Sequence, residues 1–324
     1  MKYRVLGRTG LKVSEFGLGG HEYRRWLPEE RDKDKFLKTQ PHRNILVKRL
    51  IDAGVNYFDT TEYKEAESLG LALKALEKRE NVYVSVMIVD LFKKMEESPP
   101  GRWRDIIFDG VQERMKALQT DRIDIFRICS LEKDYSRDRL ETTLKVLEEI
   151  KDQGKIGSIG ASSHELRFSA ELVRKYDSFD SMMIPYNYYL QEAKDSFFFL
   201  CRAFNIGIVV MKPLAWPYYG ISFTHFGSAN PEKGDYSAAQ TSLRWILLSR
   251  EVASVVVGIN SLDELEENLD AFTKEGKIDE NILEQHLQEA KNQQGKEKLI
   301  MLLEDPSIDV RNYAKRALMS GPWP

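Results

Sequence analysis

Strand-like and helix-like segments alternate along this chain, and that alternation restricts its fold more than any other feature of the sequence. Eight short apolar segments are each followed by a segment whose apolar residues recur every three or four positions, as on one face of a helix. Gly207–Met211 and residues 255–258 are near-continuous apolar runs, which is typical of parallel strands buried on both faces. Eight strand–helix units in series predict an α/β fold, the (β/α)8 TIM barrel.

The predicted elements can be placed by residue number. Strands are expected at 15–20, 56–60, 81–88, 122–129, 156–161, 181–187, 206–212 and 253–259. Helices are expected at 43–53, 67–77, 103–118, 137–152, 167–176, 194–203, 238–249 and 262–272. A β-hairpin is expected before the barrel, over residues 3–13. The alternative is an open doubly wound sheet, but Gly17-Leu18-Gly19-Gly20-His21 lacks the G-x-G-x-x-G spacing of its phosphate loop.

The composition shifts to a charged helical segment beyond Gly276. We therefore expect a barrel domain at 1–276 and a C-terminal helical extension at 277–324. Within the extension, residues 299–318 predict two short helices around Asp305-Pro306 and resemble one unit of a HEAT-type repeat. One such unit cannot bury its own apolar face, so we expect it to pack on the barrel. Docking on a protein partner, or self-association through these helices, is the alternative.

Charge and cysteine content narrow the classes of partner and compartment. The chain has 48 Lys and Arg against 51 Asp and Glu, a net charge of −3, which gives no broad basic surface for nucleic acid or anionic lipid. The longest apolar runs fall far short of the ~20 residues that a membrane helix needs. Two cysteines without ligand spacing predict neither a disulfide framework nor a metal site. We expect a cytoplasmic protein.

Active sites of barrel enzymes lie where the strands run into the following loops. The chemistry-bearing residues at these positions are His21, Asp59, Glu62, Tyr63, Lys64, Asp90, Arg127, Cys129, His164, Asn187, Lys212 and Asn260. Several short motifs accompany them in order, namely residues 6–14 (LGRTGLKVS), 54–60 (GVNYFDT), 121–124 (DRID), 154–156 (GKI), 160–162 (GAS) and 266–268 (EEN). This ordered set, spread over residues 3–272, resembles the aldo-keto reductase family.

The resemblance implies carbonyl reduction with NADPH by an Asp, a Tyr, a Lys and a His. Asp59 matches the aspartate. Tyr63 follows it by four residues where the family pattern has five, and Lys64 stands at the five-residue position. Either the loop is one residue shorter before Tyr63, or Lys64 replaces the tyrosine. The structural alternatives are a helix-capping role for Asp59 and a solvated loop position for Tyr63.

Two further catalytic positions of the family are substituted. The lysine position falls on Met87 and the histidine position on Cys129. A thioether has no proton to give and a neutral thiol is a weak donor, so neither can carry the expected role. His21, which follows Gly19-Gly20, is the candidate substrate contact or surrogate acid, with loop filler as the alternative.

The expected cofactor contacts are mixed in the same way. By resemblance they are Ser162, Ser163, Asn187, Lys212, Pro213, Leu214, Gly258, Asn260, Ser261 and Asn268. Ser163 replaces an asparagine of the family pattern, and methionines occupy the glutamine and tyrosine positions at 183 and 211. Glu264 stands where an arginine often reads the 2′-phosphate of NADP. A carboxylate there disfavours NADP, so we expect NADH to bind at least as tightly as NADPH.

Two functional hypotheses follow. The first is an NAD(P)H-dependent oxidoreductase of the aldo-keto reductase type, acting on a small-molecule carbonyl substrate. The second is a catalytically inactive or retooled barrel that binds a nucleotide, a metabolite or a protein partner, with His21, Glu62 and Lys64 as new acid–base groups if it is retooled. Residues 216–226 carry six aromatic side chains and predict a lid over the pocket, with packing against the helical tail as the alternative.

Overall fold

The computed structural model describes residues 1–19, 33–129, 136–215, 236–259, 261–291, 297, 300–304 and 318. Four sequence predictions therefore lie wholly or mostly outside the described residues: those for His21, for Asn260, for the aromatic segment 216–226 and for the helix pair at 299–318.

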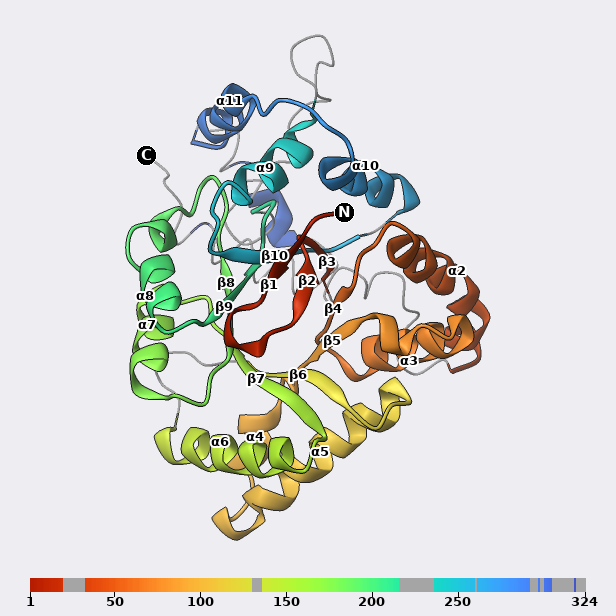
Figure 1. The fold of residues 1–324 in the computed structure, drawn as a ribbon, viewed down its shortest axis with the longest axis vertical. Coiled ribbons are helices and arrows are strands. Elements are labelled where there is room, and N and C mark those ends of the chain that lie inside the picture. Colours follow the sequence, from red (N-terminus) through yellow and green to blue (C-terminus); the bar gives the residue numbers. More distant parts are fainter. Residues whose placement is uncertain are drawn as a thin grey trace.

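Eight parallel strands close into a barrel, which confirms the predicted (β/α)8 fold (Figure 1). In chain order they are β3 (Phe16–Leu18), β4 (Tyr57–Thr60), β5 (Tyr83–Val86), β6 (Ile123–Ile128), β7 (Ile156–Ser162), β8 (Ser181–Pro185), β9 (Gly207–Met211) and β10 (Val252–Val257). Each pairs with the next, and β10 pairs with β3 to close the ring. Nearly every strand residue is buried, as the apolar runs predicted.

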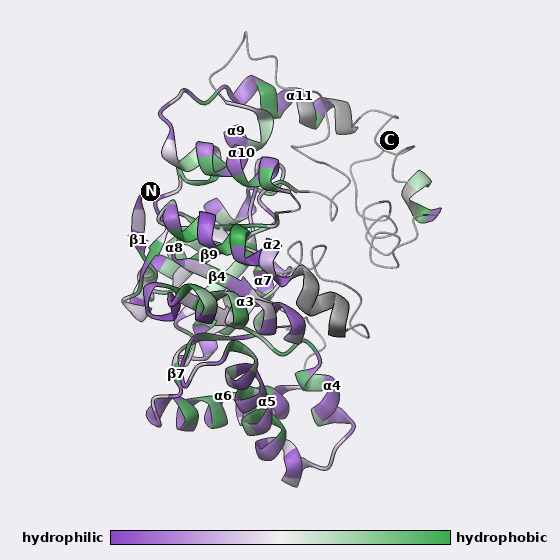
Figure 2. Cartoon of the chain, turned by 90° about the vertical axis from the view of Figure 1, so that its right-hand side faces the viewer, coloured by the Kyte–Doolittle hydropathy of each residue, from purple (hydrophilic) through white to green (hydrophobic). Residues whose placement is uncertain are grey.

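Helices surround the barrel. They are α2 (Lys33–Asp52), α3 (Tyr63–Leu76), α4 (Leu91–Glu96), α5 (Trp103–Leu118), α6 (Arg137–Asp152), α7 (Leu166–Lys175), α8 (Phe197–Ala203), α9 (Ala238–Ile246), α10 (Leu262–Thr273) and α11 (Glu280–Lys291). In α6, Leu140, Leu144, Leu147 and Ile150 form the buried stripe expected from their spacing. The exposed residues of α5 and α6 are mostly hydrophilic, and both kinds of residue alternate around these helices in Figure 2.

The predicted hairpin covers the amino-terminal end of the barrel. Strands β1 (Tyr3–Val5) and β2 (Lys12–Ser14) pair antiparallel around a short 3-10 turn, Gly7–Thr9, and lie across the barrel end in Figure 1. Gly7 has a φ of 50°, and a Cβ there would stand 2.1 Å from the backbone nitrogen of Gly207. Only glycine fits this close approach between the hairpin and the start of β9.

The first helix of the extension packs on the barrel helices. Leu283 and Leu287 of α11 are buried, and α11 contacts α9. The hydroxyl of Tyr188 donates a hydrogen bond of 3.4 Å to Oε2 of Glu284. This contact holds α11 beside the loop after β8. The division into two domains at residue 276 stays a prediction.

The structure differs from the sequence prediction mainly at helix starts. Helix α3 begins at Tyr63, four residues earlier than predicted, so Tyr63 and Lys64 lie in its first turn. Helix α4, which is absent from the predicted helices, occupies a charged segment and is held by the buried side chains of Leu91 and Met95. No described helix is long and apolar enough to cross a membrane.

Candidate functional site

The carboxyl end of the barrel carries two inward-facing charged side chains. Tyr57 on β4 and Ile125 on β6 belong to the apolar cluster that fills the barrel interior. Because side chains alternate along a strand, Asp59 and Arg127, two residues further on, face the same interior one layer nearer the carboxyl end. The hairpin closes the other end, and β1 and α4 mark these two ends in Figure 2.

Asp59 and Arg127 form a buried ion pair. Nη2 of Arg127 donates to Oδ1 and Oδ2 of Asp59 at 2.6 and 2.8 Å, and the two side chains are 5% and 4% exposed. Asp59 therefore has a cation partner from β6, although Met87 and not a lysine stands directly after β5. Arg127 is the site residue to which sequence reasoning gave no role. The signal that could have found it is a cation within the apolar strand Ile123–Ile128.

The two substituted family positions lie beside this pair but offer no strong proton donor. Cys129 is buried, and its Sγ lies 3.5 Å from the carbonyl oxygen of Ile88, to which it donates. Met87 is buried as well, and its carbonyl oxygen accepts a 3.0 Å hydrogen bond from Nε of Arg114. Both side chains thus behave as packing groups.

Tyr63 lies at the first turn of α3 against a buried cation. Its side chain is 37% exposed, and the guanidinium carbon of Arg114 lies 5.6 Å from its ring centroid, within cation–π range. Burial lowers the pKa of Arg114, and the carboxylate of Glu62 opposes that shift. Lys64 forms an ion pair with Glu67 of the same helix, at 2.7 Å. The structure thus brings Asp59 and Arg127 together and pairs Lys64 along its own helix.

Glu65 stabilises the start of α3 from inside the protein. Its Oε2 accepts hydrogen bonds from the backbone nitrogens of Thr61 at 2.7 Å and Glu62 at 3.0 Å. Oε1 is buried and has no hydrogen-bond partner among the described residues. Burial raises the pKa of Glu65 to about 8, and the nearby charge of Asp59 adds to the rise. At neutral pH this carboxyl is therefore mostly protonated.

Polar side chains follow β7 and β8 at the same end of the barrel. Ser162 ends β7, is buried, and its hydroxyl has no hydrogen-bond partner within the described part of the chain. Oγ of Ser163 accepts a 3.0 Å hydrogen bond from the nitrogen of Glu165. Asn187 is fully engaged: its amide oxygen accepts from the two backbone nitrogens of residues 189 and 190, and Nδ2 donates to the carbonyl oxygen of Lys212 at 3.0 Å.

The turn after β9 has an unusual backbone. Lys212 has a φ of 55° and Ala215 a φ of 65°, and the nitrogen of Ala215 donates to the carbonyl oxygen of Lys212 at 3.1 Å. Pro213 is anchored by a hydrogen bond from Ser242, and Leu214 packs on the core. Left-handed backbone at non-glycine residues costs free energy and concentrates at functional sites. This turn is therefore a candidate ligand contact.

The last predicted contacts lie after β10. Ser261 is the N-cap of α10, and its Oγ accepts a 3.1 Å hydrogen bond from the nitrogen of Glu264. Asn268 is buried on the same helix, and Gly258 lies half-buried before it. Asp263 and Glu264 both occupy the first turn of α10. Two carboxylates therefore stand at the helix end that would otherwise attract an anion.

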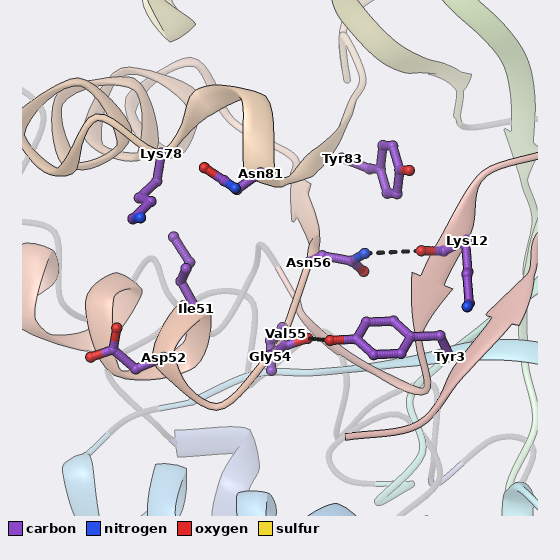
Figure 3. Close-up of a pocket in the computed structure, with 10 residues that line it drawn as sticks. All are labelled: Tyr3, Lys12, Ile51, Asp52, Gly54, Val55, Asn56, Lys78, Asn81 and Tyr83. Carbon is purple, nitrogen blue, oxygen red and sulfur yellow. Dashed lines mark hydrogen bonds between the residues drawn. The ribbon is translucent and has the colours of Figure 1, made fainter.

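A cavity of about 580 Å³ lies away from these residues, under the hairpin (Figure 3). Tyr3 donates from its hydroxyl to the carbonyl oxygen of Gly54 at 2.8 Å, and Nδ2 of Asn56 donates to the carbonyl oxygen of Lys12 at 2.9 Å. These bonds join the hairpin to the loop before β4. The cavity therefore borders the amino-terminal end of the barrel, opposite the end at which barrel enzymes carry their active sites.

Residues 17–219 match the family model described as the aldo/keto reductase family. Among curated proteins, L-galactose dehydrogenase of Arabidopsis thaliana is 25% identical over an alignment of 299 residues that covers 85% of this chain and 89% of that protein. The uncharacterized oxidoreductase YqkF of Bacillus subtilis is 23% identical over 309 residues, covering 87% of this chain and 94% of that protein.

Solved structures show the same fold. The holo form of the aldo-keto reductase AKR11C1 from Bacillus halodurans superposes with a TM-score of 0.67 at 23% identity, covering 89% of this chain and 96% of that one. A putative aldo-keto reductase from Pseudomonas aeruginosa superposes with a TM-score of 0.61 at 22% identity, covering 83% of this chain and 94% of that one. The match extends over the barrel as a whole.

Proposed function

This chain belongs to the aldo/keto reductase family, and from that membership we propose that it is an oxidoreductase that reduces the carbonyl group of a small molecule with NADH or NADPH. The observation that carries the proposal is the buried pair of Asp59 and Arg127 at the carboxyl end of an otherwise apolar barrel interior. Burying two charges is costly, and such pairs concentrate where a site needs them.

The residues present fit a nicotinamide dinucleotide. Three features border the same end of the barrel. They are the hydroxyl of Ser162, which has no partner among the described residues, the left-handed turn at Lys212, and the amino-terminal end of α10. Ser162, Lys212 and Ser261 would hold the cofactor, with Asn187 supporting Lys212 through its carbonyl oxygen. A reduced nicotinamide, when bound, supplies the hydride for carbonyl reduction.

Side chains of this protein would supply the proton and position the substrate. Tyr63 is the proposed proton donor to the substrate oxygen, and stacking on Arg114 orients its ring. Lys64, engaged by Glu67, and His21, outside the described residues, are the alternative acid groups. Asp59 holds Arg127 in place inside the barrel.

One observation favours a second candidate function. Because Met87 and Cys129 supply no strong proton donor, the barrel could serve as a non-catalytic or retooled relative that binds a nucleotide, a metabolite or a protein. Cytoplasmic localisation and a partner for the helical extension also remain predictions.

Titration with NADH and NADPH, followed by quenching of tryptophan fluorescence, tests the first proposal. Binding of either cofactor below millimolar concentration is expected, and no binding of either would overturn the proposal. Turnover of an aldehyde or ketone panel then separates the two functions. Turnover that is lost in Tyr63→Phe but kept in Tyr83→Phe, a control tyrosine beside the cavity under the hairpin, would exclude the non-catalytic alternative.

A further inference from the structure

Arg127 has hydrogen-bond donors that no described residue uses. Only its Nη2 has acceptors, the two carboxylate oxygens of Asp59. Nε is buried without a partner, and no described residue accepts from Nη1. Arg79 also pairs with a buried strand aspartate and also has a buried Nε without a partner among the described residues, but its two outer nitrogens are both used. Its Nη1 donates to the carbonyl oxygen of Val82, and its Nη2 donates to Asp124 and to a second backbone carbonyl.

The donors found near Arg127 are neutral hydroxyls: Tyr57 lies close enough to Asp59 and Arg127 for both charges to act on it, and the hydroxyl of Ser85 is buried on the strand between them. Met183 on β8 and Met211 on β9 belong to the apolar cluster that also contains Tyr57 and Ile125, and they have no proton to donate. Since an unpaired buried donor is costly, an oxygen that enters this end of the barrel gains most by accepting from Arg127.

The charge of Asp59 decides which kind of oxygen fits. The carboxylate compensates the guanidinium, so the pair presents donors without net charge. A second carboxylate would be repelled by Asp59, whereas a neutral carbonyl oxygen only needs the donor. We propose that Arg127 binds the carbonyl oxygen of a neutral aldehyde or ketone, with Asp59 as its positioning residue. The inference rests on the proposed function and assigns the group that contacts its substrate.

Two small probes of the same shape test the inference on the full chain. Isobutyramide carries a neutral carbonyl oxygen, and isobutyrate carries a carboxylate. Their affinities are measured by ligand-observed NMR with and without NADH, for the unmodified protein and for Arg127→Lys, Asp59→Asn and the matched control Arg79→Lys. The lysine keeps a cation for Asp59 but removes the outer guanidinium donors.

Isobutyramide is expected to bind more tightly than isobutyrate. Its affinity should fall about tenfold in Arg127→Lys, which is the value of one charge-assisted hydrogen bond, and stay unchanged in Arg79→Lys. Asp59→Asn should shift the preference toward isobutyrate, because the guanidinium is then uncompensated. Unchanged isobutyramide affinity in a folded Arg127→Lys protein overturns the inference.

Two further outcomes are also decisive. If Arg127→Lys does not fold, the probe preference of Asp59→Asn decides, and an unshifted preference overturns the inference. If isobutyramide binding depends on Arg127 while neither NADH nor NADPH quenches tryptophan fluorescence, the inference stands and the proposed reduction fails.

Discussion

Replacing Glu65 by glutamine is expected to stabilise the protein at neutral and alkaline pH. Burial raises the pKa of this carboxyl from its usual 4.5 to about 8 in the folded chain. A group with a raised folded pKa contributes stability that is complete below its unfolded pKa and is lost as the pH rises through the folded value. The loss therefore begins near pH 4.5 and ends above pH 8.

The size of the effect follows from the separation of the two pKa values. A shift from 4.5 to about 8 corresponds to roughly 5 kcal/mol at full ionisation, and to roughly 3 kcal/mol at pH 7. Glutamine keeps an amide oxygen that can accept from the nitrogens of Thr61 and Glu62, so the start of α3 stays capped. The titration is removed, but the amide nitrogen then occupies the buried position of the unpartnered Oε1, which costs part of the gain.

The measurement is the free energy of unfolding in urea, followed by circular dichroism at pH 5, 7 and 9. The stability of the Glu65→Gln protein should exceed that of the unmodified one by up to about 3 kcal/mol at pH 7 and by more at pH 9, and the difference should shrink toward pH 4. Glu171→Gln is the control, because Glu171 is exposed on α7 and has no ion-pair partner among the described residues. If the unfolding free energies of the unmodified and Glu65→Gln proteins change in parallel from pH 5 to pH 9, the reasoning is refuted.

Three further changes have defined outcomes. Glu264→Arg should reverse a preference for NADH into one for NADPH by several-fold in fluorescence titrations, since it removes an anion from the start of α10. Gly70→Ala should lower the unfolding free energy by about 1–3 kcal/mol, because its Cβ would stand 2.5 Å from the carbonyl oxygen of Ala117. The control Gly101→Ala, with open space around its Cβ, should leave the unfolding free energy unchanged. Leu283→Ala, at a side chain with 0% exposure, should cost about 2–5 kcal/mol of α11 packing and speed protease cleavage between α10 and α11.

The regular elements could be predicted from the sequence because their apolar patterns are strong. Helices α5 and α6 have the predicted bounds, since each carries an uninterrupted stripe that packs on the barrel. The predicted start of α3, at residue 67, was wrong for a physical reason. Its N-cap is Glu62 and its capping partner is the buried Glu65, so a glutamate replaces the serine or threonine that usually marks a helix start.

The candidate site was less predictable than the fold. Asp59 could be found from its motif, but its partner lies on β6, two strands away around the barrel. Which residues of β6 face inward depends on register, and a single sequence with nearly every strand position apolar does not reveal it. The pairing of Arg127 with Asp59 therefore becomes visible only in the folded barrel.

The attachment of the opening hairpin to the last barrel strand has a consequence for how the protein is made. Arg4 donates to the carbonyl oxygens of Leu247, Ser249 and Val252, so the opening hairpin is tied to residues synthesised far later. Strand β3 can pair with β10 only after the residues of β10 have been synthesised. During translation the first strands therefore leave the ribosome with an open edge, and contacts of such long sequence separation slow folding. A chain that stops short of β10 keeps the edges of β3 and β9 unpaired, which are templates for aggregation with other nascent chains.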